Sequence, residues 1–172
     1  INRVENSTLF LCQGNLYKAT GSFWERTVIM RADDVRVLQG IQKNTDMAVK
    51  AIRAISPKVY DDDLAVQIAR EGMKYSEIYH KATDKLLEHK AKSYQSTGFQ
   101  DMMLHSAIRG NTMLNTSTSH IAELMIQGSN RGLTDMWKTL NHHENAGNMS
   151  VELAKELMDF EEKNIERLKK YL

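Results

Sequence analysis

Histidines and glutamates recur in this chain at spacings that suit metal ligation. Glu77 and His80 are three residues apart, the Glu-x-x-His spacing with which helices of di-metal carboxylate bundles project ligands into a core. The same residue types recur in reverse order at His120 and Glu123, and residues 142–144 add two histidines and a glutamate. Metal-dependent oxidation or iron handling is the chemistry that such residues support when they meet inside a bundle.

The helical period places most of these side chains on outer faces. With residues set at 100° intervals, Glu77 falls nearly opposite the apolar arc of its helix, where Lys81 can pair with it at i,i+4. His80 lies at the edge of that arc, whereas His120 and Glu123 share the polar face of a later helix. The metal candidates that remain are Glu161, Glu71 and His80.

One carboxylate falls on an apolar face. Glu161 lies near the middle of the apolar arc of the last helical segment, with Asn164 beside it. A carboxylate there is costly unless it is paired, hydrogen-bonded or neutralised. Counting back from the last turn along an antiparallel third helix places Gly128, Ser129 and Gly132 opposite Glu161. If the two helical hairpins correspond, residues of the first two helices also lie level with Glu161, and Tyr75 lies one turn further. We expect a buried polar layer, either a hydrogen-bonded network without a ligand or a small-ligand pocket. Its predicted members are Glu161, Asn164, Tyr75, Ser129, Gly128, Gly132, Thr45 and Asn44.

Four helical segments are predicted to position these residues. Apolar residues recur at the helical period over 34–55, 62–90, 99–142 and 151–172, with Ser150 as the expected N-cap of the last segment. A continuous third helix would be ~66 Å long and would overhang the bundle. The alternative is a break around 110–119, which makes its first part a crossover. The overhang is the prediction we favour.

The first two helices resemble the last two as a pair of helical hairpins. Ile41-Gln42 stands 85 residues before Ile126-Gln127, and two such hairpins close into a four-helix bundle. The architecture resembles the ferritin-like superfamily. The segments 117–123 (STSHIAE) and 126–130 (IQGSN) resemble small, uncharacterised bundle proteins of Firmicute bacteria. This resemblance covers about 30–172 and implies an all-α, ferritin-like four-helix bundle, but it assigns no catalytic residue.

The first 29 residues follow neither the helical nor the strand period. We expect an irregular N-terminal arm over 1–29, which covers apolar surface of a bundle domain over 30–172. A second hypothesis makes residues 1–29 a translated leader that is not native, with Met30 as the natural start. Trp24-Glu25-Arg26 can be encoded by a purine-rich run that resembles a bacterial ribosome-binding site.

Composition restricts the classes of partner. The 23 basic and 22 acidic side chains leave a formal charge of +1, which gives no electrostatic footprint for nucleic acid or an acidic membrane surface. No apolar run reaches the ~18–20 residues of a membrane span. The one cysteine, Cys12, excludes an intrachain disulfide and a cysteine-based zinc site. These features predict a soluble, cytoplasmic protein.

The sequence favours a non-enzymatic structural or interaction protein. It holds no Gly-x-Gly-x-x-Gly motif, phosphate loop or serine elbow, so no catalytic residue or cofactor is predicted. A methionine-rich stripe is the expected contact surface for a second copy or another protein. The stripe consists of Phe99, Met102, Met103, Met113 and Leu114. The alternative function is a metal-dependent, di-iron-like oxidase or iron-handling protein, with iron or manganese held by Glu161, Glu71 and His80.

Overall fold

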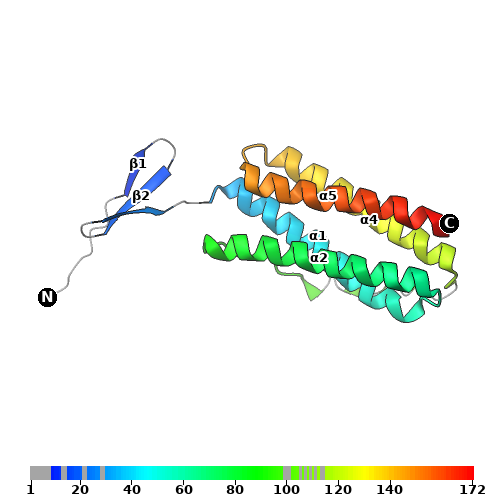
Figure 1. Ribbon diagram of the computed structural model, residues 1–172. Helices are drawn as coiled ribbons and strands as arrows, with labels where there is room; N and C mark the ends of the chain where they lie inside the picture. Colours follow the sequence, from blue (N-terminus) through cyan, green and yellow to red (C-terminus); the bar gives the residue numbers. More distant parts are fainter. Residues whose placement is uncertain are drawn as a thin grey trace.

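The computed structural model describes residues 9–12, 15–20, 23–27, 30–98, 102–104, 106, 108, 110, 112 and 115–172, with side chains from residue 30 onward. Most of the described chain is helical (Figure 1). The long helices are α1 (Ala32–Ile55), α2 (Asp62–Glu88), α4 (Thr118–His142) and α5 (Asn148–Leu168). Short 3-10 turns follow α1 at Ser56–Lys58 and α5 at Lys169–Tyr171.

The long helices pack as two antiparallel hairpins that close into one bundle. In Figure 1, α2 runs antiparallel to α1, and α5 runs antiparallel to α4. Helix α1 also packs against α4 and α5. All four contribute to one apolar core. Its largest fully buried side chains include Leu38, Ile41, Leu64, Ile68, Ile78, Leu86, Ile121, Met136, Leu157 and Leu168. The predicted helical bundle is thus confirmed in the described part of the chain, where no helix is long and apolar enough to cross a membrane.

Polar side chains set the ends of these helices. Asp61 caps α2, since its Oδ1 accepts from the backbone nitrogen of Leu64 at 2.8 Å. The prediction that Ser150 caps α5 is wrong, because α5 begins at Asn148 with Gly147 in the N-cap position. The Ser150 side chain is buried in the first turn instead, and its hydroxyl donates to Asp34 Oδ1 of α1. This bond ties the start of α5 to the start of α1.

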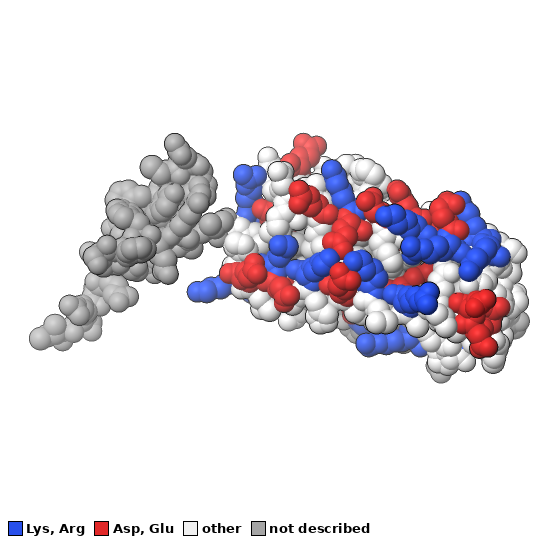
Figure 2. All heavy atoms as spheres, viewed as in Figure 1, with Lys and Arg blue, Asp and Glu red and all other residues white. Residues whose placement is uncertain are grey.

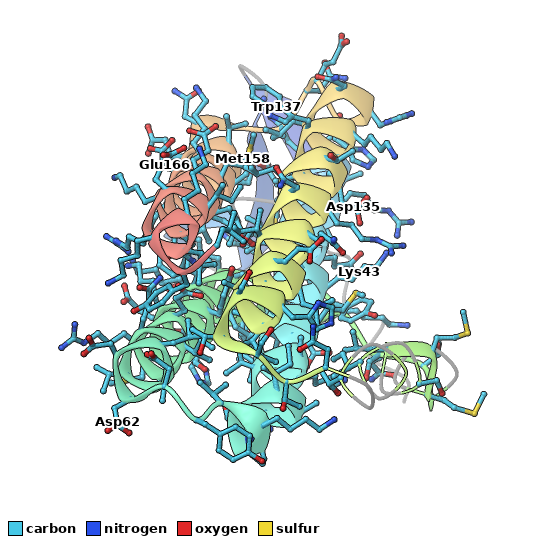
Figure 3. The ribbon with its side chains drawn as sticks, turned by 90° about the vertical axis from the view of Figure 1, so that its right-hand side faces the viewer. Lys43, Asp62, Asp135, Trp137, Met158 and Glu166 are labelled. Atoms are coloured by element: carbon cyan, nitrogen blue, oxygen red, sulfur yellow. The ribbon has the colours of Figure 1, made fainter. Side chains whose placement is uncertain are left out.

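The favoured prediction of one continuous helix over 99–142 is also wrong. The chain is non-helical over 115–117. Asn115 Oδ1 accepts from the Ser117 backbone nitrogen at 2.9 Å, and Ser117 Oγ accepts from the His120 nitrogen at 3.3 Å. Such short polar side chains offer the backbone local hydrogen bonds that compete with a helix. Residues of 98–112 that are described as helical lie beside the bundle, below and to the right of α4 in Figure 3, as the crossover alternative requires.

The N-terminal segment contains a three-stranded antiparallel sheet. Its strands are β1 (Leu9–Cys12), β2 (Asn15–Thr20) and β3 (Phe23–Thr27), in the order β1-β2-β3. The prediction of an irregular arm is therefore wrong for these residues. Their leucine, aromatic and threonine content favours strands, and the sequence supplies Gly14 and Gly21 between them. What the arm covers depends on side chains outside the described residues, and the leader hypothesis stays a prediction.

Candidate functional site

A cleft of about 500 Å³ lies between α1 and α4. Tyr75 of α2 and Glu161 of α5 reach it from the other side of the bundle and form its floor. Leu104 and Ile108, from the helical segment at 98–112, line it as well. The described lining of the cleft therefore comes from α1, α2, α4, α5 and the segment at 98–112.

The antiparallel register of α1 and α4 gives the cleft a polar half and an apolar half. A Cβ at Gly40 would meet Thr139 Cγ2 at 3.0 Å, and Asn44 Nδ2 donates to the Gly132 carbonyl at 2.9 Å. These two contacts mark the polar half, and the apolar half follows toward the end of α1. The described residues of the polar half are Gly40, Lys43, Asn44, Arg131, Gly132, Asp135, Lys138 and Thr139. Those of the apolar half are Met47, Ala48, Ala51, Ile52, Ile55, Leu104, Ile108, Leu124 and Met125. The cleft is also lined by Gln127, Gly128, Ser129 and Met136 of α4.

A buried carboxyl forms the centre of the floor. The Tyr75 hydroxyl donates to Glu161 Oε2 at 2.6 Å, and Glu161 is only 2% exposed. Burial raises the pKa of the Glu161 carboxyl, while hydrogen bonds from Ser129 and Tyr75 oppose that rise. Burial also raises the pKa of the Tyr75 hydroxyl well above its usual range, so Tyr75 remains a hydrogen-bond donor. The floor of the cleft is therefore a buried, hydrogen-bonded pair of polar groups.

Gly132 lets the backbone of α4 approach this carboxyl. A Cβ at position 132 would lie 2.9 Å from Glu161 Oε1 and 2.9 Å from Asn44 Oδ1. Asn164 lies on the far side of the floor, where its Nδ2 donates to the Tyr75 hydroxyl at 3.5 Å. The structure therefore brings together six of the residues that the sequence placed in a polar layer. They are Glu161, Tyr75, Ser129, Gly132, Asn44 and Asn164.

Two predicted members of the layer do not reach Glu161. Gly128 is exposed at the edge of the cleft, and no described atom lies within 4 Å of a Cβ placed there. It is one residue, about 100°, around α4 from the buried Ser129. Thr45 is buried, but its hydroxyl donates to the Ile41 carbonyl of its own helix at 2.8 Å. Gly128 therefore lies away from the core, whereas Thr45 is in the core but satisfies its hydroxyl within α1.

Glu71 is a second buried carboxyl, which the sequence marked only as a weak metal candidate. It lies one turn before Tyr75 and is 2% exposed. Its Oε1 accepts from Gln67 Nε2 at 3.0 Å, whereas its Oε2 has no hydrogen-bond partner among the described residues. Burial, opposed by the Gln67 bond and reinforced by the nearby charge of Glu161, raises the pKa of Glu71 to about 7. The bundle core therefore holds two buried carboxyls, each with a pKa above that of an exposed glutamate.

The three metal candidates do not converge. His80 is exposed and contacts Tyr79 edge-on, with ring centroids 5.8 Å apart. It follows Glu71 by nine residues, about 13.5 Å along α2, whereas Glu71 and Glu161 interact in the core. Among the described residues, no group of three or more His, Cys, Asp or Glu side chains could hold a metal ion. Of the three metal candidates, only Glu71 and Glu161 lie near each other.

Glu77, the carboxylate of the Glu-x-x-His motif, belongs to a surface ion-pair network. Its Oε1 lies 2.8 Å from Lys74 Nζ and 2.9 Å from Lys81 Nζ, and these bonds lower the pKa of Glu77. Both lysines also reach Glu156 of α5, at 2.9 and 2.8 Å. Figure 2 shows the result as basic and acidic side chains interleaved over α2 and α5. The expected pair with Lys81 is confirmed.

The remaining histidine motifs also make local contacts. His120 Nδ1 lies 3.6 Å from Glu123 Oε2 on the outer face of α4. His142 Nδ1 lies 2.6 Å from the Lys138 carbonyl, and His143 Nδ1 lies 3.4 Å from Asp33 Oδ1 of α1. These contacts fasten the end of α4 and the turn after it. They do not form part of the cleft.

No protein-family model, curated protein or solved structure matches this chain. The cleft and its floor are therefore the basis on which a function is proposed.

Proposed function

We propose that this chain is a non-enzymatic helical-bundle protein that binds a small molecule in the cleft between α1 and α4. The observation that carries the proposal is the continuity of the cleft from the rim residues Lys43 and Arg131 to the buried Tyr75–Glu161 pair. A core carboxyl beside an accessible cleft can hydrogen-bond a ligand that the surrounding apolar walls hold. A fully packed polar network would offer no such access.

The size and lining of the cleft support this proposal. Small-molecule sites commonly enclose about 300–1,000 Å³ and combine apolar walls with a few convergent polar groups. The cleft has about 500 Å³ and matches that description, with Asn44, Tyr75 and Glu161 as the convergent groups. The site supports binding better than catalysis, because the Tyr75 hydroxyl and the Glu161 carboxyl are already bonded to each other. Neither is set up as a free nucleophile or base.

The finer features predicted from the sequence remain part of this proposal. A ferritin-like arrangement of the helices is supported by the two hairpins α1–α2 and α4–α5. A cytoplasmic location is supported by the single cysteine, Cys12, which leaves no intrachain disulfide to favour an oxidising compartment.

Binding of a neutral, environment-sensitive dye such as Nile red tests the proposal. Ala48 lines the apolar half of the cleft, so Ala48→Phe should fill it and abolish the rise in dye fluorescence. Ala69→Phe, on the exposed face of α2, is the matched control and should bind as the unaltered protein does. Circular dichroism establishes that both variants are folded. Equal dye binding by Ala48→Phe and Ala69→Phe, or none by the unaltered protein, would overturn the proposal.

A further inference from the structure

The rim of the cleft has an excess of positive charge at one end. Lys43 of α1 and Arg131 and Lys138 of α4 line the polar half. Asp135 is the one carboxylate among the described rim residues there, so three cations stand against one anion. Figure 3 shows Lys43 and Asp135 on the same side of α4, beside this end of the cleft. Two of the basic residues, 131 and 138, are seven positions apart and so lie on one face of α4.

The opposite end of the cleft is apolar. Ile52 and Ile55 end the α1 wall, and Ile108 of the crossover segment is buried against the same apolar core. From Lys43 to Ile55 the cleft follows twelve residues of α1, about 18 Å. That length accommodates an extended molecule with a charged group at one end and an apolar body at the other. A compact ion or a uniformly polar ligand would leave most of the apolar wall without a partner.

The floor between the two ends holds the buried carboxyl of Glu161. Glu161 lies at the junction, where a Cβ at Gly132 would lie 2.9 Å from its Oε1. Burial raises the pKa of this carboxyl, and Tyr75 donates to its other oxygen. The neutral form can donate a hydrogen bond as well as accept one. The rim cations Lys43, Arg131 and Lys138, against the one rim carboxylate Asp135, are the charged groups that line the cleft at the end where the head of a bound molecule would lie.

We propose that the ligand of the cleft is an amphipathic organic anion. Its head lies among Lys43, Arg131 and Lys138, and its apolar body extends past Ala48 to Ile55 and Ile108. This inference rests on the proposed small-molecule function of the cleft and adds the chemical class and the orientation of the ligand. Specificity comes from charge at one end and from apolar burial at the other.

The test compares three probes of equal chain length by titration calorimetry with the full chain. They are dodecanoate, dodecanol and dodecyltrimethylammonium, each kept below its aggregation concentration. We expect dodecanoate to bind at least tenfold more tightly than the ammonium probe. Changing both Lys43→Gln and Arg131→Gln should weaken dodecanoate at least tenfold and leave dodecanol within twofold. Lys163→Gln, an exposed change on α5 outside this cleft, is the control and should alter neither.

The outcomes separate this inference from the function on which it rests. If dodecanol binds and Ala48→Phe blocks it, but the anion and the cation bind equally, the cleft is a binding site and the anion proposal is wrong. Dodecanoate binding that survives Ala48→Phe in a folded protein would place the anion elsewhere and would also overturn the inference. If neither Nile red nor any dodecyl probe binds the unaltered protein, the proposed function itself is wrong.

Discussion

The Tyr75 hydroxyl on α2 donates to Glu161 Oε2 on α5 at 2.6 Å, and this bond joins the two hairpins through the middle of the core. Both side chains are at most 2% exposed. The Phe160 ring packs edge-on against Tyr75, with centroids 5.0 Å apart, and keeps the phenol in place. The stability of the bundle should therefore respond to the protonation and the chemistry of this layer.

Replacing Glu161 separates its charge from its shape. Glu161→Gln retains an oxygen that accepts from Tyr75 and removes the cost of a buried charge, so the free energy of unfolding at pH 7 should stay equal or rise. Glu161→Leu leaves Tyr75 and Ser129 without their partner, and should cost about 1–3 kcal/mol for each unsatisfied group. Urea denaturation measures both changes. Glu162→Gln, on the exposed neighbour, is the control.

The same variant tests the metal-dependent alternative. An amide is a poor metal ligand, so Glu161→Gln would lower the iron or manganese content if Glu161 and Glu71 held a metal. We expect elemental analysis to give the same metal content for the variant and the unaltered protein. A Gln variant that loses several kcal/mol of stability together with bound metal would contradict the binding proposal and favour the oxidase or iron-handling function.

Glu71 should make the stability of the protein depend on pH. Its folded pKa of about 7 lies above the unfolded value of 4.5, so the folded state holds this proton more tightly. The contribution of Glu71 to the free energy of unfolding is therefore largest below about pH 4.5, and it is lost as the pH rises through about 7. At about 1.4 kcal/mol for each pH unit between the two values, the loss amounts to about 3 kcal/mol.

Glu71→Gln cannot titrate and should remove this loss. The free energy of unfolding of the variant, relative to the unaltered protein, should rise between pH 4.5 and pH 7.5. Urea denaturation at several pH values measures the difference in unfolding free energy between the variant and the unaltered protein. Contributions from titratable groups that the two proteins share cancel in this difference. Glu162→Gln should show no such trend. A difference that stays constant over the same pH range would show that Glu71 titrates normally.

Self-association through the methionine-rich stripe remains a prediction. Within the described part of the stripe, Met102 and Met103 are each 58% exposed. Exposed apolar side chains that gather in one patch favour contact with a partner. Light scattering should detect a dimer of the full chain at micromolar concentration, and Met103→Glu should shift it toward monomer. A chain that is monomeric at every concentration, with or without the change, would contradict the prediction.

Burial of Glu161 could be predicted from the sequence because it depends on one helix. The apolar residues of α5 define a face by their period, and Glu161 lies on that face whatever packs against it. The partners Ser129 and Gly132 followed from counting back along the antiparallel helix from the turn, and Asn44 followed from the correspondence of the two hairpins. Counting does not fix which way a side chain points. Gly128 is one residue, or about 100° around the helix, from the buried Ser129, and it lies at the surface.

The cleft and the break before α4 were harder to predict, for different reasons. The run at 115–119 contains Asn, Thr and Ser, which are typical of helix caps. Apolar residues continue at the helical period on both sides of this run, and that pattern favoured a continuous helix. The cleft depends on the separation of α1 from α4 and on where the segment at 98–112 lies. Both are set by contacts between residues far apart in the chain, such as Asn44 with Gly132, and no local pattern encodes them.

Two glycines one turn apart on α4 should respond oppositely to alanine. At Gly128 a Cβ meets no described atom within 4 Å, so Gly128→Ala should stabilise the protein by about 0.5–1 kcal/mol through helix propensity alone. At Gly132 a Cβ would lie 2.9 Å from Glu161 Oε1, which Tyr75 holds through the other oxygen. The resulting overpacking costs about 1–3 kcal/mol and exceeds the gain in propensity.

Gly132→Ala should therefore destabilise the protein where Gly128→Ala stabilises it, and urea denaturation of the two variants measures the contrast. Adding Glu161→Gln to Gly132→Ala should not relieve the clash, because the amide has the same size as the carboxyl. Adding Glu161→Ala removes the carboxyl and leaves the Asn44 side chain in the way, so Gly132→Ala should cost less in that background. If Gly132→Ala stabilises the protein as much as Gly128→Ala does, the close approach of α4 to the Glu161 carboxyl is wrong, and with it the geometry of the cleft floor.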